Sequence, residues 1–233
     1  MSPKNVNAIA PAVSAALPPG VRRAVKGAVS AVNRPIATQR FRSAARRLPR
    51  PIALEVGGLA PRDGWFMVNV NAVTPYYMDG TKPWIFEDGS LSHVYADNMI
   101  EHVPLAGARV FLAEAHRCLR PGGRIRLVTP DVRTHVELYL EGGDVTDSPL
   151  ADEYRTLGVV VEHPIDLLRT PIGEFGHHAG YVYDFETLDA ELRRAGFSPA
   201  ERCELQRSDD PMLRDLEQRS AHGSLQMVVE AVR

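Results

Sequence analysis

Residues 103–131 read VPLAGARVFLAEAHRCLRPGGRIRLVTPD and place a helix pattern, a glycine turn and a strand pattern in direct succession. In the first part, apolar side chains recur at the spacing of one helix face, namely Phe111, Leu112, Ala115, Cys118 and Leu119. Residues 120–123 (RPGG) are typical of a helix end, and the apolar run over 124–129 is typical of a buried strand. This stretch therefore predicts a helix over 103–119 and, after it, a strand over 124–129.

The sequence on either side continues the alternation of strands and helices. Asp184 is the expected N-cap of the last helix, and Gly196 lies just past its end. Strands that alternate with helices favour an α/β fold with a doubly wound, mostly parallel sheet, and the two final strands predict an antiparallel strand at one edge. The other predicted strands lie at 51–58, 66–70, 91–96, 200–206 and 225–232, and the other helices at 132–141 and 185–195.

The composition excludes several classes of protein. With 44% hydrophobic and 24% charged residues, 18 glycines and 18 prolines, the chain is neither collagen-like nor of low complexity. Its two cysteines, Cys118 and Cys203, fit neither a disulfide scaffold nor a metal-ligand spacing, so a reduced, cytoplasmic location is expected. No apolar run reaches the ~18 residues that a membrane-spanning helix needs.

Positive charge is concentrated at the start of the chain. Residues 1–50 contain ten Lys and Arg and no Asp or Glu, which makes this segment +10. Residues 51–233 contain the other 17 basic residues and all 29 acidic residues, which makes them −12. The split predicts two parts, a basic N-terminal arm over 1–50 and an α/β domain over 51–233.

The arm contains two helical patterns, over residues 21–34 and 36–48, which Pro35 is expected to separate into two short amphipathic helices. The first 20 residues are expected to be poorly ordered. Three interpretations stay open: the helices dock on the domain, they make a peripheral contact with an anionic membrane, or the arm is a cleaved organellar presequence. Nucleic acid is not an expected partner, because no aromatic residues interleave the basic ones.

The connection between the first two strands is short. About nine residues, 57–65, link them, whereas a parallel crossover usually needs a dozen or more residues with a helix. The crossover helix is therefore expected to be missing, which would leave one face of the sheet bare. We expect the apolar side of one of the two arm helices to cover that face.

An ordered series of motifs extends from Asp79 to Asp131. FEDGS at residues 86–90 precedes the strand over 91–96, YADNMIEHV follows at 95–103, and EAHRCLRPGG and VTPD complete the series. This series resembles the class I S-adenosylmethionine-dependent methyltransferases, and it is most similar to their short branch that is associated with sugar and polysaccharide pathways. The resemblance covers roughly residues 52–131 and resumes at 183–197 and at the last strand.

The resemblance implies a Rossmann-like fold, S-adenosylmethionine as the cofactor, and O-methylation of a hydroxyl on a sugar or other small molecule, which would be lipid-linked if the arm touches a membrane. In such a sheet, ligands bind beyond the carboxyl ends of the strands. The resemblance assigns the cofactor to seven residues: Gly57 and Gly58 under its methionine portion, Asn71 at the place of the ribose-binding acid, Asp79 and Gly80 beside the adenine, and Asp97 and Asn98 near the methionine end.

Two residues depart from the family pattern. Leu59 stands where the family usually has the second glycine of a Gly-x-Gly turn, and Asn71 stands in place of an acid. An amide bonds hydroxyl groups without the charge of a carboxylate, which would weaken cofactor binding by roughly 1–2 kcal/mol. The alternative function is therefore a non-catalytic binding or assembly subunit with a degenerate cofactor loop.

Transfer of a methyl group to a hydroxyl requires a base for the hydroxyl proton. His102 follows the third strand, and the loop over 173–181 (GEFGHHAGY) places His177 and His178 between glycines. The sequence predicts His178 or His102 as the base and leaves the choice open, beside a packing role for His102 and a solvated loop at 173–181. No metal site is expected, because adjacent histidines usually point apart. The oligomeric state is not predicted.

Overall fold

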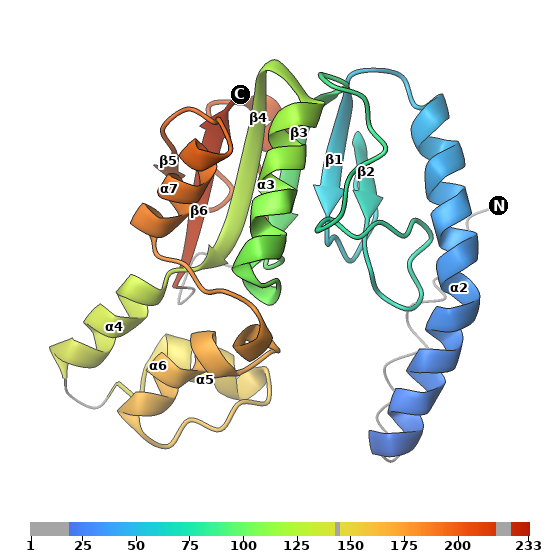
Figure 1. Cartoon of the computed structure of the whole chain (residues 1–233). Helices are drawn as coiled ribbons and strands as arrows, with labels where there is room; N and C mark the ends of the chain where they lie inside the picture. Colours follow the sequence, from blue (N-terminus) through green and yellow to red (C-terminus); the bar gives the residue numbers. More distant parts are fainter. Residues whose placement is uncertain (1–18, 143–144, 218–224) are drawn as a thin grey trace.

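A six-stranded sheet forms the centre of the structure, a computed structural model that describes residues 19–142, 145–217 and 225–233 (Figure 1). The strand order is β2-β1-β3-β4-β6-β5. The first four strands are parallel, and β6 runs antiparallel to both β4 and β5 at one end of the sheet. The predicted fold class is therefore confirmed. The strands are β1 (Ile52–Val56), β2 (Trp65–Val68), β3 (Leu91–Asp97), β4 (Leu119–Pro130), β5 (Glu201–Cys203) and β6 (Gln226–Val232).

Helices lie beside the sheet and beyond the carboxyl ends of its parallel strands (Figure 1). The long helices are α2 (Pro19–Arg47), α3 (Leu105–Cys118), α4 (Val132–Glu141), α5 (Pro149–Thr156), α6 (Pro164–Gly173) and α7 (Phe185–Arg194), and the short 3-10 helices are η2 (Ile100–His102), η3 (His177–Ala179) and η4 (Pro211–Leu213). The predictions of α3, α4 and α7 are confirmed, and Asp184 caps α7 by accepting a hydrogen bond from the backbone N–H of Thr187. The sequence interpretation missed α5 and α6, which are short and begin with a proline.

The apolar side chains of the sheet alternate between two faces. One face carries Leu54, Val94 and Leu127, which belong to the main core with α3, α7 and the second half of α2. The opposite face carries Tyr95 and Val128, and none of the long helices in the described ranges covers that part of it. There, Leu213 and Leu216 of segment 204–217 close the core. We call this segment the strap.

The arm forms one helix and not two. The helix α2 continues through Pro35, so the predicted break is wrong. Proline in a helix costs roughly 3 kcal/mol because it removes a hydrogen bond and crowds the preceding turn. Packing on both sides of it offsets this cost: the Asn33 amide donates to the carbonyl oxygens of Ala72 and Thr74, and the Phe41 ring stacks on the Phe66 ring at 6.1 Å. The prediction for residues 1–20 lies almost entirely outside the described residues.

The second half of α2 docks on the sheet, as one of the open interpretations proposed, but not on the expected face. Its buried residues Phe41 and Ala45 join the core on the α3 side. Along the sheet, the step from β1 to β2 runs in the opposite direction to the step from β3 to β4, which α3 connects. Crossovers between parallel strands are right-handed, so a helix between β1 and β2 would lie on the face opposite α3. The strap lies on that face instead, and the arm covers the other one.

Candidate active site

A cavity of about 730 Å³ opens at the carboxyl ends of β1, β3 and β4. This is where the strand order reverses direction, between β1 and β3, and it is the expected ligand position in a doubly wound sheet. The volume falls within the range of about 300–1,000 Å³ typical of small-molecule sites. The lining residues are Glu55, Gly57, Gly58, Leu59, Ala60, Arg62, Asp97, Asn98, His102, Pro130, Glu153, Tyr154, Leu157, Pro171, Phe175, His177, Leu216 and Gln226.

The turn after β1 depends on its two glycines. Gly57 has a φ of +91°, which favours glycine, and a Cβ on Gly58 would lie 2.8 Å from the Glu55 carboxylate. The Asn69 amide fixes the turn by donating to the carbonyl oxygens of Gly57 and Gly58, at 2.9 and 2.8 Å. The predicted turn thus lines the cavity, with Leu59 exposed at its mouth. The sequence interpretation missed Asn69, although it directly follows β2.

Glu55 places a buried carboxylate beside this turn. Burial raises the pKa of Glu55, and Arg62, whose Nε lies 3.5 Å from the Glu55 carboxylate, opposes part of that rise. Arg62 also donates to the carbonyl oxygen of Leu216 at 2.7 Å, which connects the strap to the cavity wall. The sequence interpretation did not assign Glu55 or Arg62, although an acid within the apolar β1 run is the kind of signal that marks a site.

Asp97 and Asn98, both predicted cofactor residues, line the cavity at the end of β3. The Asp97 carboxylate accepts a hydrogen bond from the Tyr95 hydroxyl at 3.1 Å. Asn98 has a φ of +46°, and its backbone N–H donates to the carbonyl oxygen of Val128. The Asn98 Oδ1 is buried and has no hydrogen-bond partner among the described residues. A buried acceptor of this kind fits a ligand that brings a donor.

The structure does not bring the other three predicted cofactor residues to the cavity. Asn71 is exposed, and its Oδ1 accepts from the backbone N–H of Val73 in a local turn. Asp79 likewise accepts from the backbone N–H and the hydroxyl of Thr81. Gly80 is buried, and a Cβ there would lie 3.3 Å from both Val56 and Phe111. These contacts give the three residues structural roles in the loop between β2 and β3.

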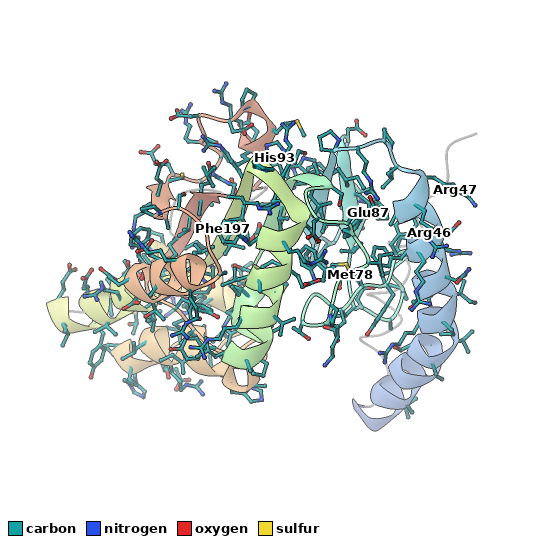
Figure 2. The ribbon with its side chains drawn as sticks, turned by 45° about the horizontal axis from the view of Figure 1, so that its top comes forward. Arg46, Arg47, Met78, Glu87, His93 and Phe197 are labelled. Atoms are coloured by element: carbon teal, nitrogen blue, oxygen red, sulfur yellow. The ribbon has the colours of Figure 1, made fainter. Side chains whose placement is uncertain are left out.

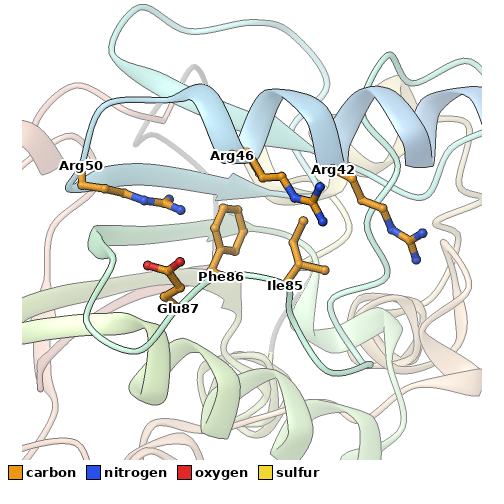
Figure 3. A pocket seen from close by; sticks show the side chains of 7 residues that line it. Arg42, Arg46, Arg50, Ile85, Phe86 and Glu87 are labelled. Carbon is orange, nitrogen blue, oxygen red and sulfur yellow. The ribbon is translucent and has the colours of Figure 1, made fainter.

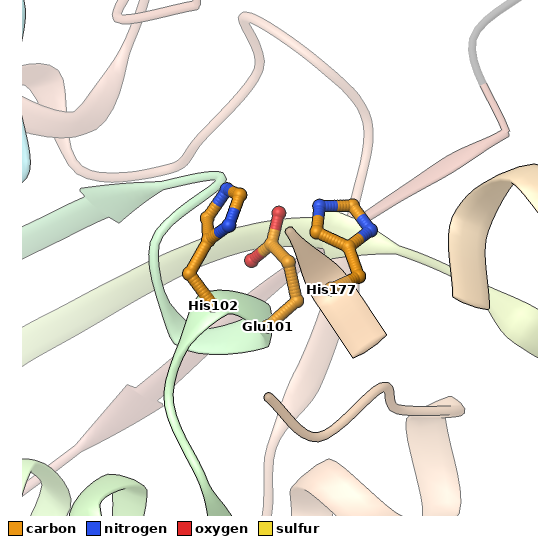
Figure 4. Close-up of side chains that lie close together, drawn as sticks. All are labelled: Glu101, His102 and His177. Atoms are coloured by element: carbon orange, nitrogen blue, oxygen red, sulfur yellow. The ribbon is translucent and has the colours of Figure 1, made fainter. Parts of the chain in front are cut away.

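Two histidines that line the cavity face each other (Figure 4). The rings of His102 and His177 meet edge to face, with their centroids 4.7 Å apart. The Nδ1 of His177 lies 2.9 Å from the carbonyl oxygen of Pro171, which only accepts, so the proton is assigned to Nδ1 and Nε2 is left as an acceptor. Partial burial and the neighbouring His177 lower the pKa of His102, so its ring stays neutral at pH 7.

Glu101 lies beneath this pair. Its side chain is fully buried, and it accepts a hydrogen bond from the Thr129 hydroxyl at 3.1 Å. One ligand atom from each of Glu101, His102 and His177 lies within 4.8 Å of the others, so these three residues could gather around a metal ion. The absence of a metal stays a prediction from the sequence.

His178, the other predicted base, is exposed and does not line the cavity. Its neighbour His177 is buried and lines the cavity, although the sequence interpretation named His178 and not His177 as a possible base. The orientation of the loop is set by Gly180, which packs directly against the backbone of Glu101 and His102. Such a long-range contact cannot be read from the local sequence, so the choice between adjacent histidines was not predictable.

The helices α5 and α6 form the remaining wall. Tyr154, Leu157 and Phe175 give this wall an aromatic and apolar character. The Tyr154 hydroxyl donates to the Nε2 of His135 at 2.7 Å, because the His135 Nδ1 proton is used on the carbonyl oxygen of Asp131. The chamber is thus bounded by polar groups on the sheet side and by rings on the helical side.

Comparison with known proteins adds to this geometry. Residues 68–127 match a family described as a methyltransferase domain. No curated protein matches the chain. Among solved structures, it is similar to a SAM-dependent methyltransferase from Thermotoga maritima, with 16% identity, coverage of 84% of this chain and 89% of the other, and a TM-score of 0.41.

It is also similar to phosphoethanolamine N-methyltransferase 2 of Haemonchus contortus in complex with S-adenosyl-L-methionine, with 14% identity, coverage of 84% and 52%, and a TM-score of 0.43. Similarity this low does not carry function from one protein to another.

None of the helices in the described ranges is long and apolar enough to cross a membrane. The family match covers β3 and most of β4, and it supports a methyltransferase domain and the predicted cofactor S-adenosylmethionine.

Proposed function

We propose that this protein is an S-adenosylmethionine-dependent methyltransferase that methylates a hydroxyl group on a sugar or other small molecule. The observation that carries the proposal is that one cavity contains both the glycine turn after β1 and the His102–His177 pair. A cofactor cradle and a neutral base in one chamber are what this reaction requires.

The cofactor side of the cavity consists of Gly57, Gly58, Asp97 and Asn98. The glycines allow a ligand to approach the backbone, the Asp97 carboxylate suits a cationic amino group, and the unpaired Asn98 Oδ1 accepts from a donor. When bound, S-adenosylmethionine supplies an electrophilic methyl group on a sulfonium. The chain's own residues hold the acceptor in line with that methyl group and exclude water.

The acceptor side favours a neutral hydroxyl compound. Arg62 is the single Arg or Lys among the described lining residues, and it is already bonded to Glu55 and to the strap. A phosphate or carboxylate acceptor would be repelled by the carboxylates of Glu55, Asp97 and Glu153, and no unbonded cation of the described lining would offset this repulsion. The ring of Tyr154 offers the flat apolar surface on which sugar rings pack.

We propose His102 as the group that takes the hydroxyl proton, in preference to His178. Its ring lines the cavity and is neutral at pH 7, and His177 lies beside it with Nε2 as an acceptor. His177 is a positioning residue, because its contact with the Pro171 carbonyl fixes the ring against which His102 packs.

Calorimetric titration tests the cofactor side. The protein is expected to bind S-adenosylmethionine and its demethylated product near micromolar concentrations. Asp97→Asn keeps the side-chain shape and removes the charge, and it should weaken binding about tenfold or more. Asn71→Ala is the control and should leave the affinity within about twofold, because Asn71 lies outside the cavity. No binding at millimolar cofactor would instead favour the non-catalytic binding or assembly subunit.

The pH dependence of turnover tests the base. Only the neutral ring accepts a proton, and the pKa of His102 is lowered from its ordinary value of 6.5, so turnover should decline on acidification only below pH 6.5. The variant His102→Gln should reduce turnover at least about 100-fold and remove its decline at acidic pH. The variant His178→Ala should change turnover less than about twofold. A large loss in His178→Ala with none in His102→Gln would reverse the assignment.

We keep the proposal of a cytoplasmic protein, which rests on two cysteines that are not paired with each other, Cys118 and Cys203. The peripheral membrane contact predicted for the basic arm would belong to α2, and in that case a lipid-linked acceptor becomes the favoured one. Neither proposal includes nucleic acid as a partner.

A further inference from the structure

The first half of α2 has an apolar side that nothing in the described structure covers. Its row of Val21, Val25, Val29, Val32 and Ile36, which we call the valine row, follows one side of the helix at steps of three and four residues. Each of these side chains is 40–68% exposed. The docked residues of the same helix, Ala37, Phe41 and Ala45, lie on a different side and are at most 4% exposed.

The same outer side becomes basic toward the end of the helix. Continuing from Ile36 in the same steps, it reaches Gln39, Ser43 and Arg46, which line a shallow hollow with Arg42 and Arg47. These three arginines are exposed, and Arg46 and Arg47 lie on α2 at the outer margin of the molecule (Figure 2). One side of a single helix thus carries apolar residues first and arginines after them.

A second hollow of about 380 Å³ lies between the end of α2 and residues 85–87. Arg42, Arg46 and Arg50 line it together with Ile85, Phe86 and Glu87 (Figure 3). A guanidinium group binds phosphate oxygens through two parallel N–H donors, and three such groups at one hollow exceed the single carboxylate of Glu87. The hollow is therefore suited to the phosphate of a lipid headgroup.

We infer that α2 binds the surface of an anionic phospholipid bilayer, with the valine row at the boundary between headgroups and acyl chains and the arginines on lipid phosphates. The charge of the helix selects this partner. It contains eight Lys and Arg and no Asp or Glu over 29 residues, or about 43 Å of helix. A second copy that packs its α2 against this one would place like charges against each other, whereas an anionic bilayer supplies negative charge along the whole length.

The inference does not depend on the reaction proposed above, because none of these α2 residues lines the cavity at the sheet. The first half of α2 extends past the carboxyl ends of β1 and β2 (Figure 1).

Co-sedimentation of the full chain with vesicles tests this inference. Vesicles of phosphatidylcholine with about a third phosphatidylserine should bind at least about tenfold more tightly than phosphatidylcholine alone, and high salt should abolish the difference. Arg42→Gln/Arg46→Gln should weaken binding about 25-fold, at about fivefold per arginine, and flatten the salt dependence. Val25→Gln/Val29→Gln/Val32→Gln should weaken it about tenfold and leave the salt dependence unchanged.

Matched variants elsewhere on the surface control for net charge and polarity. Arg120→Gln/Arg194→Gln and Val136→Gln/Val160→Gln change exposed residues of the domain and should bind vesicles like the unchanged protein. The inference would be overturned if the two α2 variants bound vesicles as tightly as the two control variants. It would also be overturned if vesicle binding did not depend on phosphatidylserine. Sedimentation analysis showing a dimer that the valine variants dissociate would assign α2 to a second copy. Loss of vesicle binding in inorganic phosphate at constant ionic strength would assign the hollow to a soluble anion.

Discussion

Arg126→Leu is expected to lower the free energy of unfolding by about 3–5 kcal/mol, measured by urea denaturation. Arg126 lies in β4 on the face that the strap covers, and it is completely buried. All five of its N–H donors are used. Two contact the Glu217 carboxylate at 2.7 and 3.1 Å, one contacts Glu230, and two contact the carbonyl oxygens of Arg207 and Glu204 at 3.0 and 3.2 Å. The variant would leave two carboxylates in the interior without their cation.

The loss should depend on pH in a defined direction. Without the guanidinium, two buried carboxylates lack a cation, and burial disfavours the charged form of a carboxyl group. The folded state of the variant then binds more protons, so its deficit shrinks as the pH falls and grows as the pH rises. A deficit that is the same at acidic and neutral pH would mean that lost packing, not unpaired charge, destabilises the variant.

Two further variants separate the interaction from its surroundings. Replacing Arg126, Glu217 and Glu230 together by leucine removes both carboxylates along with their cation and should recover most of the loss, because apolar groups often replace a buried ionic cluster without cost. Arg194→Leu removes an exposed partner of Glu191 and should cost less than about 0.5 kcal/mol. If the triple variant is no more stable than Arg126→Leu, then the two carboxylates left without a cation are not what destabilises the single variant.

This cluster also shows what the sequence could not predict. The strands and most helices follow from local patterns: glycines after β1 and α3, an aspartate that caps α7, and apolar runs of the right length. The position of the cavity follows from the parallel sheet. The strap is different, because Arg126 and Glu217 are 91 residues apart and neither belongs to a local motif. Nothing in the strap's own sequence indicates that it covers a sheet face.

The candidate site was predictable to the same extent. The residues Gly57, Gly58, Asp97, Asn98 and His102 line the cavity, because each lies at the end of a strand or in the turn after it, and the positions of these strands were predicted correctly or nearly so. Asn71 and Asp79 lie in the long loop after β2, where local turns decide the direction of each side chain. Helix α2 continues through Pro35 because tertiary contacts outweigh a local helix-breaking preference.

The contact between Gly180 and Glu101 leads to the second large effect: Gly180→Ala should reduce turnover about 100-fold or more. A Cβ at Gly180 would lie 1.8 Å from the carbonyl oxygen of Glu101 and 2.9 Å from the carbonyl carbon of His102. Both atoms belong to the backbone, so no side-chain rotation relieves the overlap. The φ of −104° at Gly180 lies outside the left-handed region that favours glycine, so the prediction rests on crowding.

To make room for the Cβ that Gly180→Ala adds, η3 must move away from η2 by about 1 Å or more. This movement takes His177 away from His102. Displacement on that scale costs about 100-fold in rate where groups must be held in line. The affinity for S-adenosylmethionine should change little, because Gly57 and Asp97 lie on other elements. Gly173→Ala in the same region is the matched control, since its Cβ would meet its nearest atom only at 3.9 Å.

A second measurement makes this prediction independent of the reaction. The nearby His177 contributes to the lowered pKa of His102, so separating the rings should raise the pKa of His102 toward its ordinary value of 6.5. Titration of the His102 ring protons by NMR measures this directly. An unchanged pKa of His102 together with unchanged turnover in Gly180→Ala would contradict the prediction. It would show that the loop accommodates the added Cβ without moving His177, so that the His102–His177 pair does not need the close approach that glycine permits.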